Sequence, residues 1–341
     1  MAGYSFNGRL FAFCLILLLS QVVSAQALTP GEQVLNEARR LEARVNSLSL
    51  SENETKLYTD GLKRVQVTAR NDRVLLSLYF LQPLQLAVMT NDYHKAKADI
   101  IKKGTEAFES EWKSLGEQLN LKEQRFKSQA APFTAAVLAL AEASLTQVHP
   151  YYQSGRLYAL NRSVDEGMFY LGRAPASLEF ALFCQQLRFD KPRARLKLRS
   201  ITVELNALET ETLAAYEKSE NKDLRPFIST NVTMKMAADL NREQRYFGAL
   251  LKYLDATLFL HLLNAVPPNT AQQDELRKQQ EVFDKRLTSG KTDHSIGLIY
   301  WQMSQRALHP SAEDTIGPEE LKRATVIITE VLPRYFKITT L

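Results

Sequence analysis

A cluster of basic residues around Pro192 is the first place in this sequence where side chains are spaced to do chemistry. The segment turns acidic from Glu204 onward, and we expect one helix to begin at Pro192 and carry both parts. Positive charge at a helix start opposes the helix dipole, and a bound anion would relieve this conflict. Salt bridges to an acidic neighbouring helix, or simple solvation, are the alternative. The candidate anion-binding residues are Arg188, Lys191, Arg193, Arg195 and Arg199.

A second segment places tyrosines beside arginines. Tyr151 and Tyr158 are seven residues apart and share one face of a helix. Tyrosine offers apolar area with a polar tip, which suits a ligand groove or a partner interface. The alternative is that the aromatic stripe belongs to the core. The candidate groove or interface residues are Tyr151, Tyr152, Arg156, Tyr158 and Tyr170.

Local catalytic motifs are scarce in this chain. It contains no G-x-G-x-x-G, no G-x-x-x-x-G-K-[ST] and no G-x-S-x-G. Glu109-Ser110 resembles the Glu-Ser pair of lytic transglycosylases, although the Gly-Leu-Met-Gln segment of that family does not follow it. The resemblance implies a cell-envelope, peptidoglycan-directed hydrolase of helical fold with Glu109 as the general acid. Because catalytic groups also assemble from distant positions, the sequence leaves an enzyme open, although it favours a non-enzyme.

Histidine and cysteine spacing predicts no metal site and no cofactor. None of the five histidines has a glutamate three residues before it, and no two lie within five residues of each other. A Cys-x-x-Cys-His haem motif is also missing. The histidines are His94, His149, His261, His294 and His309.

Residues 1–27 have the pattern of a secretory signal peptide. A basic start at Arg9 precedes an uncharged apolar run, and small residues follow. We expect cleavage after Ala25 or Ala27, export to a periplasm or the extracellular space, and no stable transmembrane anchor afterwards. Cleavage would leave Cys184 as the single cysteine, within an apolar stretch typical of a buried thiol.

Composition places the rest of the chain among globular proteins. The 341 residues are 45% hydrophobic and 24% charged. Without the signal peptide the chain carries 42 basic and 38 acidic residues, a net charge of +4. This charge is too small and diffuse to indicate nucleic-acid binding.

Apolar residues recur at helical spacing throughout residues 28–341, and no hairpin signal occurs. We therefore predict an all-α fold of about ten helices, either an irregular helical bundle or stacked helical hairpins. Capping boxes should begin helices at Thr29, Ser51 and Ser163. Pro83 should kink or split a helix, and His149-Pro150 should start a new one.

Later in the chain we expect one long helix over 229–266 and shorter helices over 272–287, 295–308 and 318–332. Residues 28–341 are predicted to form the helical domain, with a weak sub-boundary near 189–192. The leading functional expectation is an exported, soluble interaction or ligand-binding protein whose partner is a protein or a small anionic ligand. Besides the hydrolase, a helical envelope-assembly factor that binds proteins through exposed apolar patches is an alternative.

Overall fold

The computed structural model describes residues 28–128, 134–187, 189, 196–218 and 224–340, and its regular secondary structure in these ranges is entirely helical. This confirms the all-α prediction. The predicted signal peptide lies outside the described residues. The helices are α2 (Pro30–Ser47), α3 (Glu52–Arg70), α4 (Val74–Ala96), α5 (Ala98–Lys103), α6 (Thr105–Ser128), α7 (Ala135–Asn161), α8 (Val164–Gln186), α9 (Thr202–Lys218), α10 (Leu224–Arg242), α11 (Tyr246–Leu262), α12 (Thr270–Thr288), α13 (Ser295–Leu308), α14 (Pro318–Val326), the π-helix η1 (Ile327–Val331) and α15 (Leu332–Thr339).

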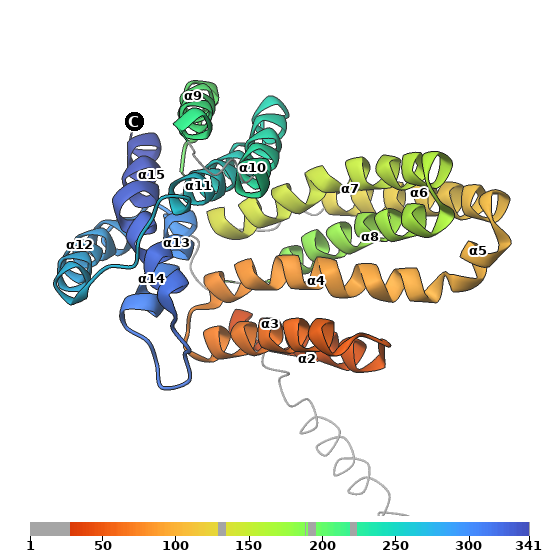
Figure 1. The fold of residues 1–341 in the computed structure, drawn as a ribbon, viewed down its shortest axis with the longest axis horizontal. Coiled ribbons are helices and arrows are strands. Elements are labelled where there is room, and N and C mark those ends of the chain that lie inside the picture. The colour runs from red at the N-terminus through yellow and green to blue at the C-terminus, as the bar shows by residue number, and fades with distance from the viewer. Residues whose placement is uncertain (1–27, 129–133, 188, 190–195, 219–223, 341) are drawn as a thin grey trace, which may run out of the picture.

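The helices form an elongated bundle (Figure 1). The long helices α4, α7 and α8 run side by side with α6, and the pair α2–α3 packs against α4. The later helices, from α9 to α15, gather at one end of these long helices. The largest buried cluster takes side chains from both parts, from Val34 in α2 to Ile338 in α15.

Two glycines allow α7 and α8 to approach closely. A Cβ on Gly155 of α7 would lie 2.9 Å from the backbone of Leu171 in α8. Gly167 of α8 meets the backbone and side chain of Ala159 in α7 in the same way. Each helix contributes one glycine, so the backbones of α7 and α8 are in direct contact at two positions along the helix pair.

Local start signals are largely confirmed. Thr29 and Ser51 form complete capping boxes with Glu32 and Glu54. Ser163 accepts a hydrogen bond from the backbone N–H of Glu166 but lacks the reciprocal bond. Cys184 is fully buried, as its apolar surroundings predicted, and burial raises the pKa of its thiol.

Prolines interrupt the helices less than the sequence predicted. Helix α4 continues through Pro83 rather than splitting, and α7 continues through Pro150, so the expected new helix at His149-Pro150 is wrong. Pro150 is exposed, and the close α7–α8 packing outweighs the loss of one backbone hydrogen bond.

Two other predicted helices are corrected. Residues 196–201 are not helical, and α9 begins only at Thr202. Asn241 holds this stretch in place: its Oδ1 accepts from the Ile201 backbone N–H, and its amide nitrogen donates to Ser200 and Thr202. These contacts compete with helix formation.

The helix predicted over 229–266 is divided into α10 and α11. Gln244 adopts a left-handed backbone conformation with φ of 60°, and the N–H of Arg245 donates to the carbonyl of Leu240. This is the hydrogen bond of a Schellman motif, which ends a helix.

Among the described helices, α4 alone is long and apolar enough to span a membrane by length and composition. Within the fold, 56% of its apolar window is buried.

Candidate anion-binding site

A charged pocket of about 380 Å³ lies between α3, α13 and the loop that joins α13 to α14. We call it the arginine pocket. Two arginines on separate elements face it, Arg64 from α3 and Arg306 from α13. The full lining is Asp60, Lys63, Arg64, Val67, Arg306, Glu313, Asp314, Thr315, Gly317 and Glu320.

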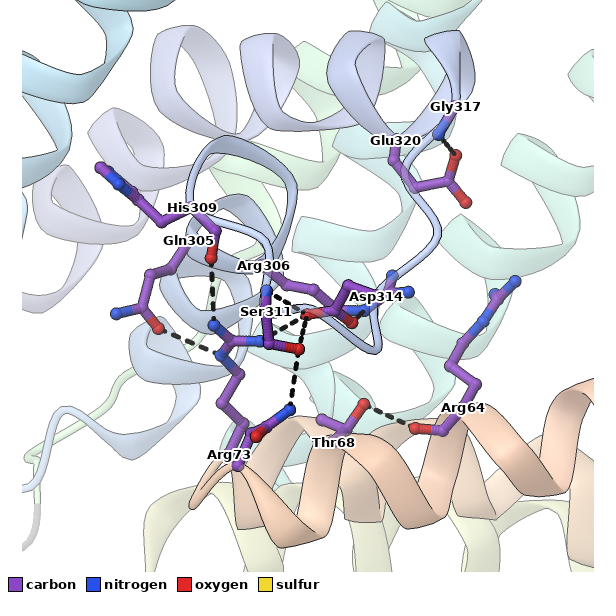
Figure 2. Close-up of polar contacts among 11 residues, drawn as sticks. Arg64, Thr68, Arg73, Gln305, Arg306, His309, Ser311, Asp314, Gly317 and Glu320 are labelled. Atoms are coloured by element: carbon purple, nitrogen blue, oxygen red, sulfur yellow. Dashed lines mark hydrogen bonds and ion pairs between the residues drawn. The ribbon is translucent and has the colours of Figure 1, made fainter.

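Asp314 lies at the centre of a hydrogen-bond network that forms one wall of the pocket (Figure 2). Its carboxylate accepts from Arg306 Nε at 2.6 Å and from Arg73 Nη1 at 3.3 Å. The backbone N–H and the hydroxyl of Ser311 donate to the same carboxylate at 3.0 and 2.8 Å. The Asp314 side chain is 0% exposed, so these four bonds replace its lost hydration.

A helix-ending turn places Arg73 where it reaches Asp314. Helix α3 ends with Asp72 in the left-handed region, at φ of 57°, and the N–H of Arg73 donates to the carbonyl of Thr68. The remaining guanidinium donors of Arg73 reach Gln305 Oε1 at 3.2 Å and the His309 carbonyl at 3.4 Å. Arg73 is therefore a positioning residue that fastens the α13–α14 loop to the core.

The hydrogen bonds on Asp314 determine its titration. Burial alone would raise the pKa of this carboxyl, but the bonds from Ser311 and Arg306 together hold it below its ordinary value of 3.8. Asp314 is therefore ionised at neutral pH and keeps the Arg306 guanidinium fixed at the pocket wall.

Arg64 is arranged differently from the two arginines on Asp314. No carboxylate of the described residues lies within ion-pair distance of its guanidinium, which instead lies 5.6 Å from the centre of the Phe80 ring. Arg64 is exposed at its surface, but partial desolvation of its guanidinium lowers its pKa. The charges of Arg306 and Arg323 lower this pKa further, while the carboxylates of Glu320 and Asp60 act in the opposite direction. The Nε of Arg323 is itself buried with no hydrogen-bond partner among the described residues. Three guanidinium groups thus lie near one another beside the pocket. The lining itself carries three cations, Lys63, Arg64 and Arg306, and four carboxylates, Asp60, Glu313, Asp314 and Glu320.

Carboxylates complete the lining around the arginines. Glu320 accepts from the backbone N–H of Gly317 at 3.1 Å. Asp60 and Glu313 are exposed, as is Lys63. Carboxylate oxygens accept hydrogen bonds from hydroxyl groups, whereas guanidinium groups bind anions. The arrangement can therefore bind a small anion that also carries hydroxyl groups.

The predicted anion site at the basic segment lies elsewhere. Arg188, Lys191, Arg193 and Arg195 are outside the described residues, and Arg199 is exposed in the non-helical stretch before α9. Because α9 begins at Thr202 and has Glu204 in its first turn, the dipole conflict that motivated this site is not present at α9. The site itself stays a prediction.

The predicted groove residues lie on α7 and α8, where all are half-buried. Tyr158 and Tyr170 stack with ring centres 4.0 Å apart. Tyr152 stacks on Trp112 at 4.7 Å, and its hydroxyl donates to the Trp112 carbonyl. Three of the four tyrosine rings thus stack on other aromatic rings, and Tyr151 alone of the predicted residues lines a described pocket. A ligand groove or partner interface here stays a prediction.

Glu109, the candidate catalytic acid, forms an ion pair with Arg156, whose Nε lies 3.0 Å from the carboxylate. The same guanidinium lies 4.4 Å from the centre of the Trp112 ring. Glu109 lines none of the described pockets. A half-buried ion pair outside any described pocket is typical of a structural carboxylate.

Sequence reasoning missed every residue of the arginine pocket. One signal was present: Asp60, Arg64 and Val67 have the spacing of a single helix face. Their partners Arg306 and Asp314 lie far away in the sequence, and only the fold brings them close. Among the described residues, no group of three His, Cys, Asp or Glu side chains is arranged to hold a metal ion.

A third depression, between α10 and α11, is apolar and includes Val232, Phe259 and Leu263. Nothing among the described residues indicates what would cover it.

Comparisons of the chain with protein-family models, with curated proteins and with solved structures found no match.

Proposed function

We propose that this protein is an exported, non-catalytic binding protein that holds a small hydroxylated anion, such as a sugar acid, in the arginine pocket. The observation that carries the proposal is the pairing of Arg64 and Arg306 across one pocket. Arg306 is held by Asp314, whereas Arg64 has no carboxylate of the described residues within ion-pair distance. A ligand anion would supply the missing partner.

The pre-formed geometry supports binding. Arg73, Arg306 and Ser311 fix Asp314 before any ligand arrives, so little conformational entropy is lost when a ligand binds. The exposed carboxylates of Asp60 and Glu313 provide acceptors for hydroxyl groups at the pocket mouth. Export to a periplasm or the extracellular space belongs to the proposal and rests on the predicted signal peptide.

The hydrolase alternative is weakened by the ion pair of Glu109 with Arg156. A general acid of this class must also lie in a cleft that admits the substrate, and Glu109 lines none of the described pockets.

Calorimetric titration with glucuronate, and with glucose as its uncharged analogue, tests the proposal. We expect glucuronate to bind at least about tenfold more tightly, because charge-assisted hydrogen bonds contribute about 1.5–3 kcal/mol. Arg64→Gln should remove this preference. Arg70→Gln, an exposed arginine of the same helix that does not line the pocket, should leave it unchanged. Equal binding of both sugars, or no effect of Arg64→Gln, would contradict an anion site here.

A further inference from the structure

A second pocket lies where α4, α7, α8, α10 and α11 meet, and it differs from the arginine pocket in size and chemistry. Its volume is about 170 Å³. Apolar side chains, including Leu86 and Phe180, line one part, and Ser144, Tyr151 and Lys252 contribute polar groups. We call it the lysine pocket. Among the described residues that line it, Lys252 alone carries a charge at neutral pH.

Lys252 is held in place by a buried carboxylate. Its Nζ lies 2.8 Å from Asp255 Oδ2, and the two side chains are only 13% and 3% exposed. Asp255 Oδ1 accepts from the hydroxyls of Tyr79 and Tyr300, each at 2.8 Å. The carboxylate therefore has hydrogen bonds on both oxygens without any ligand. An ammonium group has three N–H donors, and the bond to Asp255 uses one of them.

A second cation, Arg173, lies beside Tyr151, one of the residues that line this pocket. Arg173 precedes the lining residues Ala176 and Ser177 by about one turn of α8, so all three share a helix face. Its guanidinium lies over the rings of Tyr151 and Tyr170, at 5.4 and 4.9 Å from their centres. No carboxylate of the described residues lies within ion-pair distance of Arg173. A cation without a carboxylate partner among the described residues therefore lies beside Tyr151, while the wall formed by Leu86 and Phe180 is apolar.

The volume limits what fits inside. An apolar cavity of about 150 Å³ holds one benzene molecule in a well-studied engineered protein. A pocket of 170 Å³ therefore accommodates a single six-membered ring or a short alkyl chain, with a polar group directed toward the mouth.

We propose that the lysine pocket binds a small carboxylic acid with a compact apolar body, whose carboxylate bonds to Lys252 and faces Arg173. This site is independent of the arginine pocket: it takes an apolar acid instead of a hydroxylated one, and the two pockets share no lining residue.

The test is titration of the purified protein with benzoate, and with benzyl alcohol as the uncharged probe, followed by ligand-observed NMR. Benzoate should bind at least about tenfold more tightly than benzyl alcohol, because it alone makes charge-assisted hydrogen bonds. Lys252→Met should weaken benzoate binding by a similar factor. Because that variant leaves Asp255 without its ammonium partner, a second variant must leave the ion pair intact.

Gln147→Trp provides that second variant. Gln147 is a half-buried lining residue of α7, and an indole in its place should occupy pocket space while both members of the Lys252–Asp255 pair are retained. We expect it to abolish benzoate binding. Gln118→Trp, which makes the same substitution at an exposed position of α6, should bind benzoate as the parent does.

Three results would overturn the lysine-pocket proposal. The first is the absence of benzoate binding at millimolar concentration. The second is equal binding of benzoate and benzyl alcohol, and the third is benzoate binding that survives Gln147→Trp. Loss of benzoate binding in Arg64→Gln, with Gln147→Trp unaffected, would assign the acid to the arginine pocket instead.

Discussion

Arg306 Nε lies 2.6 Å from Asp314 Oδ1, and the two side chains are 11% and 0% exposed. This short, shielded pair joins the end of α13 to the loop that closes the arginine pocket. Because Arg73 donates to the same carboxylate from the start of α4, one anion connects three separate parts of the chain.

Replacement of Asp314 should destabilise the fold strongly. In Asp314→Asn the side chain keeps its shape but leaves two buried guanidinium groups without a counter-ion. Breaking a buried ion pair in this way costs about 3–5 kcal/mol. Urea unfolding measures the loss. Asp274→Asn breaks an exposed pair with Arg277 and should cost less than about 1 kcal/mol. Similar losses in the two variants would show that the Asp314 pair does little for stability.

Asp314 also predicts a pH dependence of stability. Its pKa is lower in the folded chain than in the unfolded chain, so the unfolded chain binds the proton more readily. The stabilisation is complete above the ordinary pKa of 3.8 and is lost as the pH falls through the lowered folded value. The free energy of unfolding should therefore fall more steeply below about pH 4 in the parent than in Asp314→Asn. Parallel curves for the two proteins would contradict the assignment.

A buried amide in α4 predicts a stabilising substitution. Gln85 is 0% exposed, and neither its Oε1 nor its Nε2 has a hydrogen-bond partner among the described residues. Gln85→Met keeps the length of the side chain and removes the unsatisfied groups, so it should raise stability by about 1–3 kcal/mol.

The control for this substitution is Gln280→Met. Gln280 is also buried, but its amide donates to the Ser304 hydroxyl at 2.9 Å. Loss of that bond should lower stability by about 1 kcal/mol. Thermal unfolding compares the two variants, and a destabilised Gln85→Met would show that the amide has a partner in solution, such as bound water.

The close α7–α8 approach predicts low tolerance for a methyl group. Gly155→Ala places a Cβ 2.9 Å from the backbone of Leu171, which cannot move aside as a flexible side chain would. We expect a loss of about 1–3 kcal/mol in denaturant unfolding, despite the better helix propensity of alanine. Gly61→Ala in α3 meets only the side-chain end of Leu84, at 3.1 Å, and should be close to neutral. A neutral Gly155→Ala would mean that the two helices separate at little cost.

The sequence alone predicted the features that depend on residues close together in the chain. Capping boxes at Thr29 and Ser51 involve groups three residues apart, and both form. Apolar spacing identified the helical class and the exact span of α13, and the apolar stretch around Cys184 predicted its burial. These features depend on contacts within one or two turns of a helix, which the order of residues specifies directly.

Tertiary contacts decided the rest. Asn241 bonds to Ser200 and Ile201, which stay outside the helix that was predicted to begin at Pro192, and packing carries α7 through Pro150. The arginine pocket depends on Arg73 and Asp314, which are 241 positions apart. No period or spacing in the sequence relates two residues at that separation. Their proximity arises only when several helices have packed, and for that reason the pocket became visible in the fold and not in the sequence.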